Sequence, residues 1–205
     1  LFLGAAMFWA GFEQAGSSLN LFAERYTDRF IGDFEAPASW LQSVNPIMII
    51  LLAPAFAAFW SYLARRNLEP STPLKFGFGL LLLGAGFAVM FFASRLVAAG
   101  NPVLPIWLIT TYLFHTMGEL ALSPVGLSAT TRLAPRRYVG QMMGVWFVGA
   151  ALGNVLAGLL AGELTGEGVD QMPALFQQVA LTSAGAGIVM LVFTRPITRL
   201  MGSAR

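Results

Sequence analysis

The sequence predicts an all-α integral membrane protein with six transmembrane helices, and two observations carry this prediction. Hydrophobic residues make up 57% of the chain and charged residues only 11%, whereas soluble domains carry about 25% charged residues. The apolar residues also fall into six runs, each near the roughly 20 residues that a helix needs to cross a bilayer. Because hydrocarbon offers backbone groups no partner, every run is expected to be helical.

Turn-forming residues separate these runs. Pro37 is expected in the first turn of the second helix, and the Glu-Pro-Ser-Thr-Pro stretch at 69–73 separates the second run from the third. The expected spans are 2–23, 39–63, 74–96, 103–131, 138–164 and 173–194. The chain has no cysteine and one histidine, which excludes disulfides and leaves little for a metal cluster. We therefore expect neither a metal nor a cofactor.

Basic side chains gather at one end of the expected bundle. Nine of the twelve Lys and Arg residues fall there: Arg65, Arg66, Lys75, Arg132, Arg136, Arg137, Arg195, Arg199 and Arg205. The other end carries Arg25, Arg29 and Arg95 together with Glu24, Asp28, Asp33, Glu35, Glu163, Glu167 and Asp170. The positive-inside rule makes the basic end cytoplasmic. The chain begins inside an apolar run at Leu1, so we expect a fragment of a longer multi-pass protein of the inner (plasma) membrane, with both ends of the fragment cytoplasmic.

Two acidic residues, Glu13 and Glu119, fall within the expected spans, and no Lys or Arg lies deep in any span. A charge at membrane depth costs about 3 kcal/mol on insertion scales, so such a residue is a functional hypothesis by default. Burial disfavours the ionised form. We expect both groups either to hold a proton or to meet cations from outside this chain, which is what a proton carrier requires. The alternative for Glu119 is a hydrogen bond to a polar neighbour in a tilted span.

Other polar and aromatic residues lie at similar depth. Asn45 precedes Pro46, a pair that can unwind a helix and free carbonyl groups, although Asn45 and Asn20 equally fit hydrogen bonds between helices. Trp146 lies deep in the fifth span and either lines a cavity or packs against its neighbours. His115 lies one turn before Glu119, and it either relays protons or bonds to a neighbour.

Proline and glycine residues predict where helices bend and where they touch. Pro124 follows Ser123 in the fourth span and should bend that helix, so Pro124, Gly126 and Gly118 form a candidate gating hinge. Glycine pairs in the fifth span predict tight packing, expected against the fourth span: Gly140 with Gly144, Gly149 with Gly153, and Gly158 with Gly162. The third and sixth spans lack deep charges and are expected outside, against lipid, with looser packing at Gly84, Gly86, Gly185 and Gly187.

Four motifs resemble the proton-dependent oligopeptide transporters. Residues 8–14, followed by Gly16, Ser17 and Ser18, resemble the seventh helix of that family, and residues 42–46 resemble the start of the eighth. The most specific motif is residues 118–128 (GELALSPVGLS), which resembles the tenth-helix signature. Residues 142–147 resemble the eleventh helix. The likeness covers the whole chain as the C-terminal six-helix bundle of a twelve-helix major facilitator transporter, and the short loops favour the bacterial branch of the family.

This resemblance implies proton-coupled symport of di- and tripeptides by alternating access. It implies that Glu13 takes part in proton coupling and that Glu119 lies near the peptide amino terminus or pairs with a lysine of the other half. It implies that Asn45 contacts the peptide and Trp146 lines a side-chain pocket. Ser123 and Glu13 complete the candidate binding set, and Ala150 departs from the serine of some relatives. The implied partners are peptides, the proton as coupling ion, lipid and the absent N-terminal half; no nucleic acid is expected.

Two alternatives remain open on the sequence. A proton-coupled facilitator for a drug, sugar or nitrate would share the fold and the buried acids. A rhomboid-type intramembrane serine protease also has six spans, but it needs a serine activated by a histidine. Its Gly-x-Ser-Gly motif is missing, and the nearest approach is Gly126-Leu127-Ser128-Ala129 with His115 as the one candidate base. We therefore expect a protein that is not an enzyme.

Overall fold

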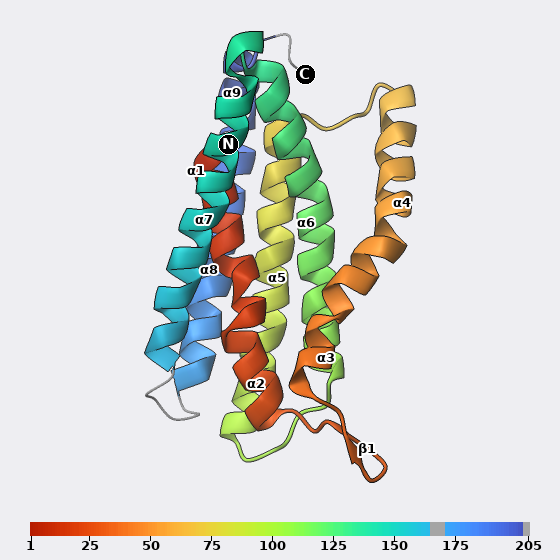
Figure 1. Ribbon diagram of the computed structural model, residues 1–205, viewed down its shortest axis with the longest axis vertical. Coiled ribbons are helices and arrows are strands. Elements are labelled where there is room, and N and C mark those ends of the chain that lie inside the picture. Colours follow the sequence, from red (N-terminus) through yellow and green to blue (C-terminus); the bar gives the residue numbers. More distant parts are fainter. Residues whose placement is uncertain (165–170, 203–205) are drawn as a thin grey trace.

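A computed structural model describes residues 1–164 and 171–202 of the chain, so Glu167, Asp170 and Arg205 lie outside the described residues. The described part is an elongated bundle of helices with one small hairpin at its end (Figure 1). The helices are α1 (Phe2–Phe12), η1 (Glu13–Gly16), α2 (Ser18–Tyr26), α3 (Ala38–Gln42), α4 (Val44–Arg65), α5 (Thr72–Ala98), α6 (Ile106–Leu133), η2 (Arg136–Tyr138), α7 (Val139–Leu164), α8 (Met172–Val192) and α9 (Thr194–Leu200). All-α architecture is therefore confirmed.

The hairpin joins the first two membrane segments. Strands β1 (Phe30–Ile31) and β2 (Phe34–Glu35) pair antiparallel, with Phe30 opposite Glu35. Gly32 supplies the positive φ of 64° that the tight turn requires. The Arg29 side chain closes the hairpin, donating to the Ala36 carbonyl and to Glu35 Oε1 at 2.6 Å.

Four stretches of the described residues are long and apolar enough to cross a membrane: Ala38–Arg65, Thr72–Ala98, Arg136–Leu159 and Met172–Val192. The protein is thus a multi-pass membrane protein, and two of the six expected spans are interrupted within the described residues. The span expected at 2–23 is broken, because α1 ends at Phe12 and a 3₁₀ turn over Glu13–Gly16 precedes α2. The span expected at 39–63 is interrupted at Ser43, between α3 and α4.

The remaining spans differ in smaller ways. α6 is 28 residues long and runs without a break through Pro124, so the proline does not end the helix. Its Thr, Ser, His and Glu side chains make it less apolar than the four stretches above. The sixth span ends at Val192, and the chain continues into the short α9. In α4 the bend visible in Figure 1 has a physical cause in Pro54, which lies inside that helix.

Helix α5 is the centre of the packed core, and this overturns the expectation that the third span lies outside against lipid. Within the described residues, 56% of its apolar window is buried, the highest share among the four candidate spans. A Cβ on Gly84 would lie 3.0 Å from the Ala180 carbonyl of α8, and a Cβ on Gly79 would lie 2.9 Å from the Gly118 carbonyl of α6. These glycines let three backbones approach closely, so the looser role expected for Gly84 is wrong.

The tight partner of α7 is α1 rather than the fourth span. A Cβ on Gly153 would lie 2.5 Å from Trp9 Cβ and 2.8 Å from the Ala10 nitrogen. By contrast, a Cβ on Gly140, Gly144 or Gly158 would meet no atom within 4 Å. Among the glycine pairs of α7, the pair Gly149 and Gly153 therefore makes the close contact with α1.

The connections fall at two opposite ends of the bundle, as Figure 1 shows. One end holds the α4–α5 and α6–α7 connections and α9; the other holds the hairpin and the α5–α6 connection. Of the nine basic residues expected to lie together, the eight that the structure describes fall at the first end: Arg65, Arg66, Lys75, Arg132, Arg136, Arg137, Arg195 and Arg199. The alternation on which the charge argument depends is therefore present in the structure.

Candidate functional site

The first part of the site forms around Glu119, which lies near the middle of α6 and is half-buried. Asn45 reaches it from the first turn of α4, just after the break at Ser43. The Asn45 amide nitrogen donates to Thr116 Oγ1 at 2.9 Å and to Glu119 Oε2 at 3.4 Å. Thr116 and Glu119 lie on one face of α6 because residues three apart are neighbours on a helix. A helix break thus presents an amide to a carboxyl group.

The second part forms around Glu13, at the start of the 3₁₀ turn that interrupts the first membrane segment. Asn154 of α7 faces it. When the Asn154 amide nitrogen is turned toward Glu13, it donates to both carboxylate oxygens at 3.1 Å. Glu13 and Glu119 are also near enough for their charges to interact. The sequence placed both acids in the same site by their depth, and the structure brings them into electrostatic contact.

Gln14, next to Glu13, fixes the broken segment to α7. Its side chain is fully buried, and Nε2 donates to the Ala157 carbonyl at 3.2 Å. Its Oε1 accepts from Ser18 Oγ at 2.5 Å and from Ser17 Oγ at 3.3 Å. The backbone at Ser17 departs from the helical region, with φ −124° and ψ −95°. These hydrogen bonds satisfy the polar side-chain groups of Gln14, Ser17 and Ser18 at the break. Glu13 therefore lies on a backbone that is irregular but anchored to α7.

Trp146 packs in the core instead of standing free in a cavity within this bundle. It is 5% exposed, its ring lies edge-on to Phe76 with centroids 6.2 Å apart, and it fills the space beside Gly126, where a Cβ would collide with it. A Cβ on Gly118 would lie 2.8 Å from the Gly79 carbonyl of α5. Both glycines of the candidate hinge are therefore places of close approach, and their role in gating stays a prediction.

His115 is enclosed by apolar side chains. It is 1% exposed, with the Phe87 ring 4.7 Å and the Phe12 ring 6.4 Å away between centroids. Neither of its ring nitrogens has a hydrogen-bond partner among residues 1–164 and 171–202. The structure therefore gives it no bond to Glu119, one turn further along α6.

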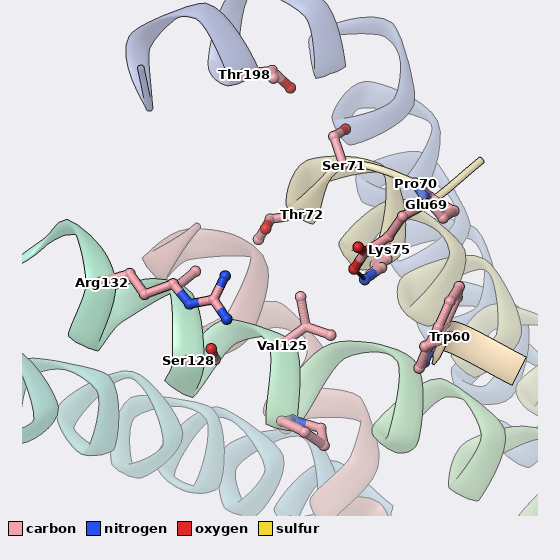
Figure 2. A pocket seen from close by; sticks show the side chains of 12 residues that line it. Trp60, Glu69, Pro70, Ser71, Thr72, Lys75, Val125, Ser128, Arg132 and Thr198 are labelled. Atoms are coloured by element: carbon pink, nitrogen blue, oxygen red, sulfur yellow. Dashed lines mark hydrogen bonds and ion pairs between the residues drawn. The ribbon is translucent and has the colours of Figure 1, made fainter. Parts of the chain in front are cut away.

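A separate pocket of about 640 Å³ opens at the basic end of the bundle. Figure 2 shows Lys75 and Thr72 at the start of α5, Ser128 and Arg132 on α6, and Trp60 of α4 around it. Pro124 lines this pocket and is exposed, whereas Ser123 beside it is half-buried. Lys75 Nζ lies 2.7 Å from Glu69 Oε1 and 4.7 Å from the centre of the Trp60 ring. Pro124, expected in the gating hinge, thus lines a pocket at the basic end of the bundle.

Two residues of the site were not identified from the sequence. Asn154 sits in an apolar helix between small residues, and the signal that could have found it is that an amide at membrane depth needs a partner. Thr116 offers no such signal, because threonine usually bonds to its own helix. One carboxyl group lies on an interrupted segment, and the other is met by an amide that follows a second helix break. This pattern is typical of secondary transporters, whose sites are built from broken helices near the membrane centre.

Comparison with known proteins agrees with this class. The family model described as "POT family" matches residues 1–173. The peptide transporter YePEPT of Yersinia enterocolitica subsp. palearctica is 44% identical over the whole chain, which covers 40% of that protein. A di-/tripeptide transporter of Lactococcus lactis subsp. cremoris is 33% identical over the whole chain, which covers 41% of it. The crystal structure of a mutant of the peptide transporter POT with alafosfalin superposes with a TM-score of 0.88 at 35% identity, over 99% of this chain and 41% of that one.

The chain belongs to the POT family. Its fold is accordingly that of a major facilitator membrane protein. It spans about 40% of the length of the curated relatives it matches. These relatives are named as transporters and not as enzymes.

Proposed function

We propose that this chain is the C-terminal half of a transporter that carries di- and tripeptides across the bacterial inner membrane together with protons. The relatives named as peptide and di-/tripeptide transporters support the substrate class. The observation that carries the proposal within the chain is the contact between Asn45 and Glu119, where a helix break meets a carboxyl group at membrane depth.

A zwitterionic peptide needs an acid for its ammonium group and a base for its carboxylate. Glu119 supplies the acid. The Asn45 nitrogen is engaged with Thr116 and Glu119, which leaves the Asn45 oxygen to accept from a peptide N–H group. No Lys or Arg lies deep in the expected spans of this chain, so the bases come from the N-terminal half. In this arrangement Ser123 borders the peptide as the two halves close, and Trp146 supports the site from the core behind it.

Glu13 carries the coupling proton. Its charge acts on Glu119, so loading a proton on Glu13 changes how strongly Glu119 holds its own partner. Alternating access needs such a difference in binding between two states. The basic end of the bundle faces the cytoplasm in this proposal, because cytoplasmic loops are enriched in Lys and Arg.

The test is dialanine uptake in proteoliposomes by the full-length protein, with an inward proton gradient. We expect Glu13→Gln and Glu119→Gln each to lose at least about tenfold of driven uptake, the cost of one charge-assisted hydrogen bond. Glu13→Gln should keep counterflow exchange, in which the proton need not be released. Asp33→Asn, an exposed acid in the turn of the hairpin, is the matched control. Wild-type protein that accumulates no dialanine under the gradient contradicts the substrate assignment.

A further inference from the structure

The structure places the side chain of Asn154, on α7, against Glu13. It lies directly after Gly153, where α1 and α7 approach so closely that a Cβ would lie 2.8 Å from the Ala10 nitrogen. The buried Gln14–Ala157 hydrogen bond lies one turn further along α7. Asn154 thus lies between two points where α7 is fixed to the broken first segment, and its side chain is exposed on the surface of this bundle beside Glu13.

An amide can satisfy a carboxyl group in either protonation state. Ionised Glu13 only accepts hydrogen bonds, and the Asn154 NH₂ group donates to both of its oxygens at 3.1 Å. Protonated Glu13 has a hydroxyl to donate, and the Asn154 oxygen accepts it after the amide turns by half a rotation. Neither α1 nor α7 has to move. Resting on the proposed role of Glu13, we infer that Asn154 is a positioning residue that holds Glu13 in both protonation states and favours release of its proton.

The preference for release follows from the strengths of the two bonds. A hydrogen bond to an ionised group is roughly twice as strong as one between neutral groups. The amide therefore stabilises ionised Glu13 more than protonated Glu13, and it opposes the penalty that burial places on the charge.

Other titratable groups near Glu13 are few in the described residues. Glu119 on α6 is the second carboxyl group of the site, and α2, which follows η1 directly, carries Glu24, Arg25 and Tyr26 in its last turn. His115 on α6 packs against the rings of Phe12 and Phe87, with centroids 6.4 Å and 4.7 Å away. The sequence of α8 contains no titratable side chain, that of α7 has Glu163 near its far end, and that of α5 has Lys75 and Arg95 at its two ends.

The experiment compares Asn154→Leu and Asn154→Asp in the full-length protein in proteoliposomes. Dialanine counterflow exchange and proton-driven uptake are measured over a range of external pH. Without the amide, Glu13 keeps its proton to higher pH. We expect Asn154→Leu to retain exchange within about twofold and to shift the pH of half-maximal driven uptake upward by on the order of one unit.

Asn154→Asp separates this role from packing, because it has the same shape but cannot donate to ionised Glu13. We expect an upward shift larger than that of Asn154→Leu, since two facing carboxyl groups share one proton. A packing role alone predicts no change for Asn154→Asp. Gly153→Ala is the packing comparison, and it should lower exchange and driven uptake together. Gln177→Leu, an exposed amide on α8, is the matched control and should be silent.

The outcomes distinguish this inference from the proposed function. If Glu13→Gln abolishes driven uptake while both Asn154 variants match Gln177→Leu, Asn154 has no positioning role and the proposed function stands. If Asn154→Leu lowers driven uptake equally in wild-type and Glu13→Gln backgrounds, Asn154 acts independently of Glu13 and the inference is overturned. If wild-type protein shows no response to the proton gradient, both are overturned.

Discussion

Helices α4 and α5 are consecutive along the chain and both are long and apolar enough to cross a membrane, yet they pack in opposite ways. None of the apolar window that includes α4 is buried in the described bundle, against 56% of the window in α5. The difference lies in side-chain size. α5 carries four glycines at which a Cβ would lie 2.5–3.0 Å from an atom of α6 or α8: Gly77, Gly79, Gly84 and Gly86. The sequence of α4 contains no glycine.

The comparison teaches that hydropathy and packing are separate kinds of information in a membrane protein. Lipid is as apolar as leucine, so apolar residues place a helix in the bilayer without determining which helices pack against it. Small residues determine the neighbouring helices, because they allow close backbone contact. Helix α4 instead contacts α6 through polar groups at Asn45. Under the proposed function, its uncovered apolar surface is free to meet lipid and the N-terminal half.

The largest expected effect on stability comes from creating a cavity in the core around α5. Trp146→Ala removes a ring that is 5% exposed and packed on Phe76 of α5, and it should lower stability by about 3–5 kcal/mol. Phe59→Ala on α4, 51% exposed, should change it by no more than about 0.5 kcal/mol. Thermal unfolding of the full-length protein in detergent measures both. Equal shifts would mean that α4 is as well packed as α5.

The next effect tests the glycine argument within one helix. A Cβ on Gly187 of α8 would lie 3.0 Å from the Gly77 carbonyl of α5 and from Leu81 Cγ, whereas a Cβ on Gly185 would meet no atom within 4 Å. Gly187→Ala should therefore destabilise by about 1–3 kcal/mol. Gly185→Ala should be neutral or stabilise by up to about 1 kcal/mol, since alanine favours a helix. Thermal unfolding in detergent again measures both variants. If Gly187→Ala stabilised the protein, close backbone contact could not be the reason that α5 is buried.

Much of this architecture could be predicted from the sequence, and the failures have physical causes. The third span was expected at 74–96 and α5 covers Thr72–Ala98, because turn-forming residues bound a long apolar run. The break at Ser43 lies beside Asn45 and Pro46, the pair expected to unwind a helix. The break at Glu13–Gly16 could not be predicted, because no proline marks it in the sequence. The equal weight given to all glycine spacings was wrong, because spacing does not say which face meets a neighbour.

The candidate site divides in the same way. Glu13 and Glu119 could be found from the sequence, because a charge in a span is costly wherever it points. Asn154 could not be found in this way, because its role depends on Glu13, a partner far away in the sequence. Their roles in coupling and peptide binding remain predictions, as do those of Ser123, Pro124 and Gly126.

A smaller effect should come from the polar contact by which α4 meets α6. Thr116→Val removes the hydroxyl that accepts from the Asn45 amide at 2.9 Å. In a double-mutant cycle with Asn45→Ala, the two sites should couple by about 1 kcal/mol of unfolding free energy. Thr130→Val is the control, because Thr130 bonds to the Gly126 carbonyl of its own helix and should not couple to Asn45. Additive effects of Asn45 and Thr116 would mean that this contact does not hold α4.

The smallest expected effect concerns the connection between α4 and α5. Lys75, at the start of α5, is 6% exposed and touches both Glu69 of the connection and the Trp60 ring of α4. The Glu69 side chain is 49% exposed, and the pocket of about 640 Å³ beside the pair admits water. Glu69→Gln should therefore cost at most about 1 kcal/mol, the value of an exposed ion pair, with the difference from wild type shrinking at high salt. Trp60→Leu in the same assay removes the aromatic face, and a similar small loss is expected. A loss of several kcal/mol in Glu69→Gln, unchanged by salt, would show that the connection fixes α4 to α5 as firmly as the glycines fix α5 to α8. The different burial of α4 and α5 would then not depend on side-chain size.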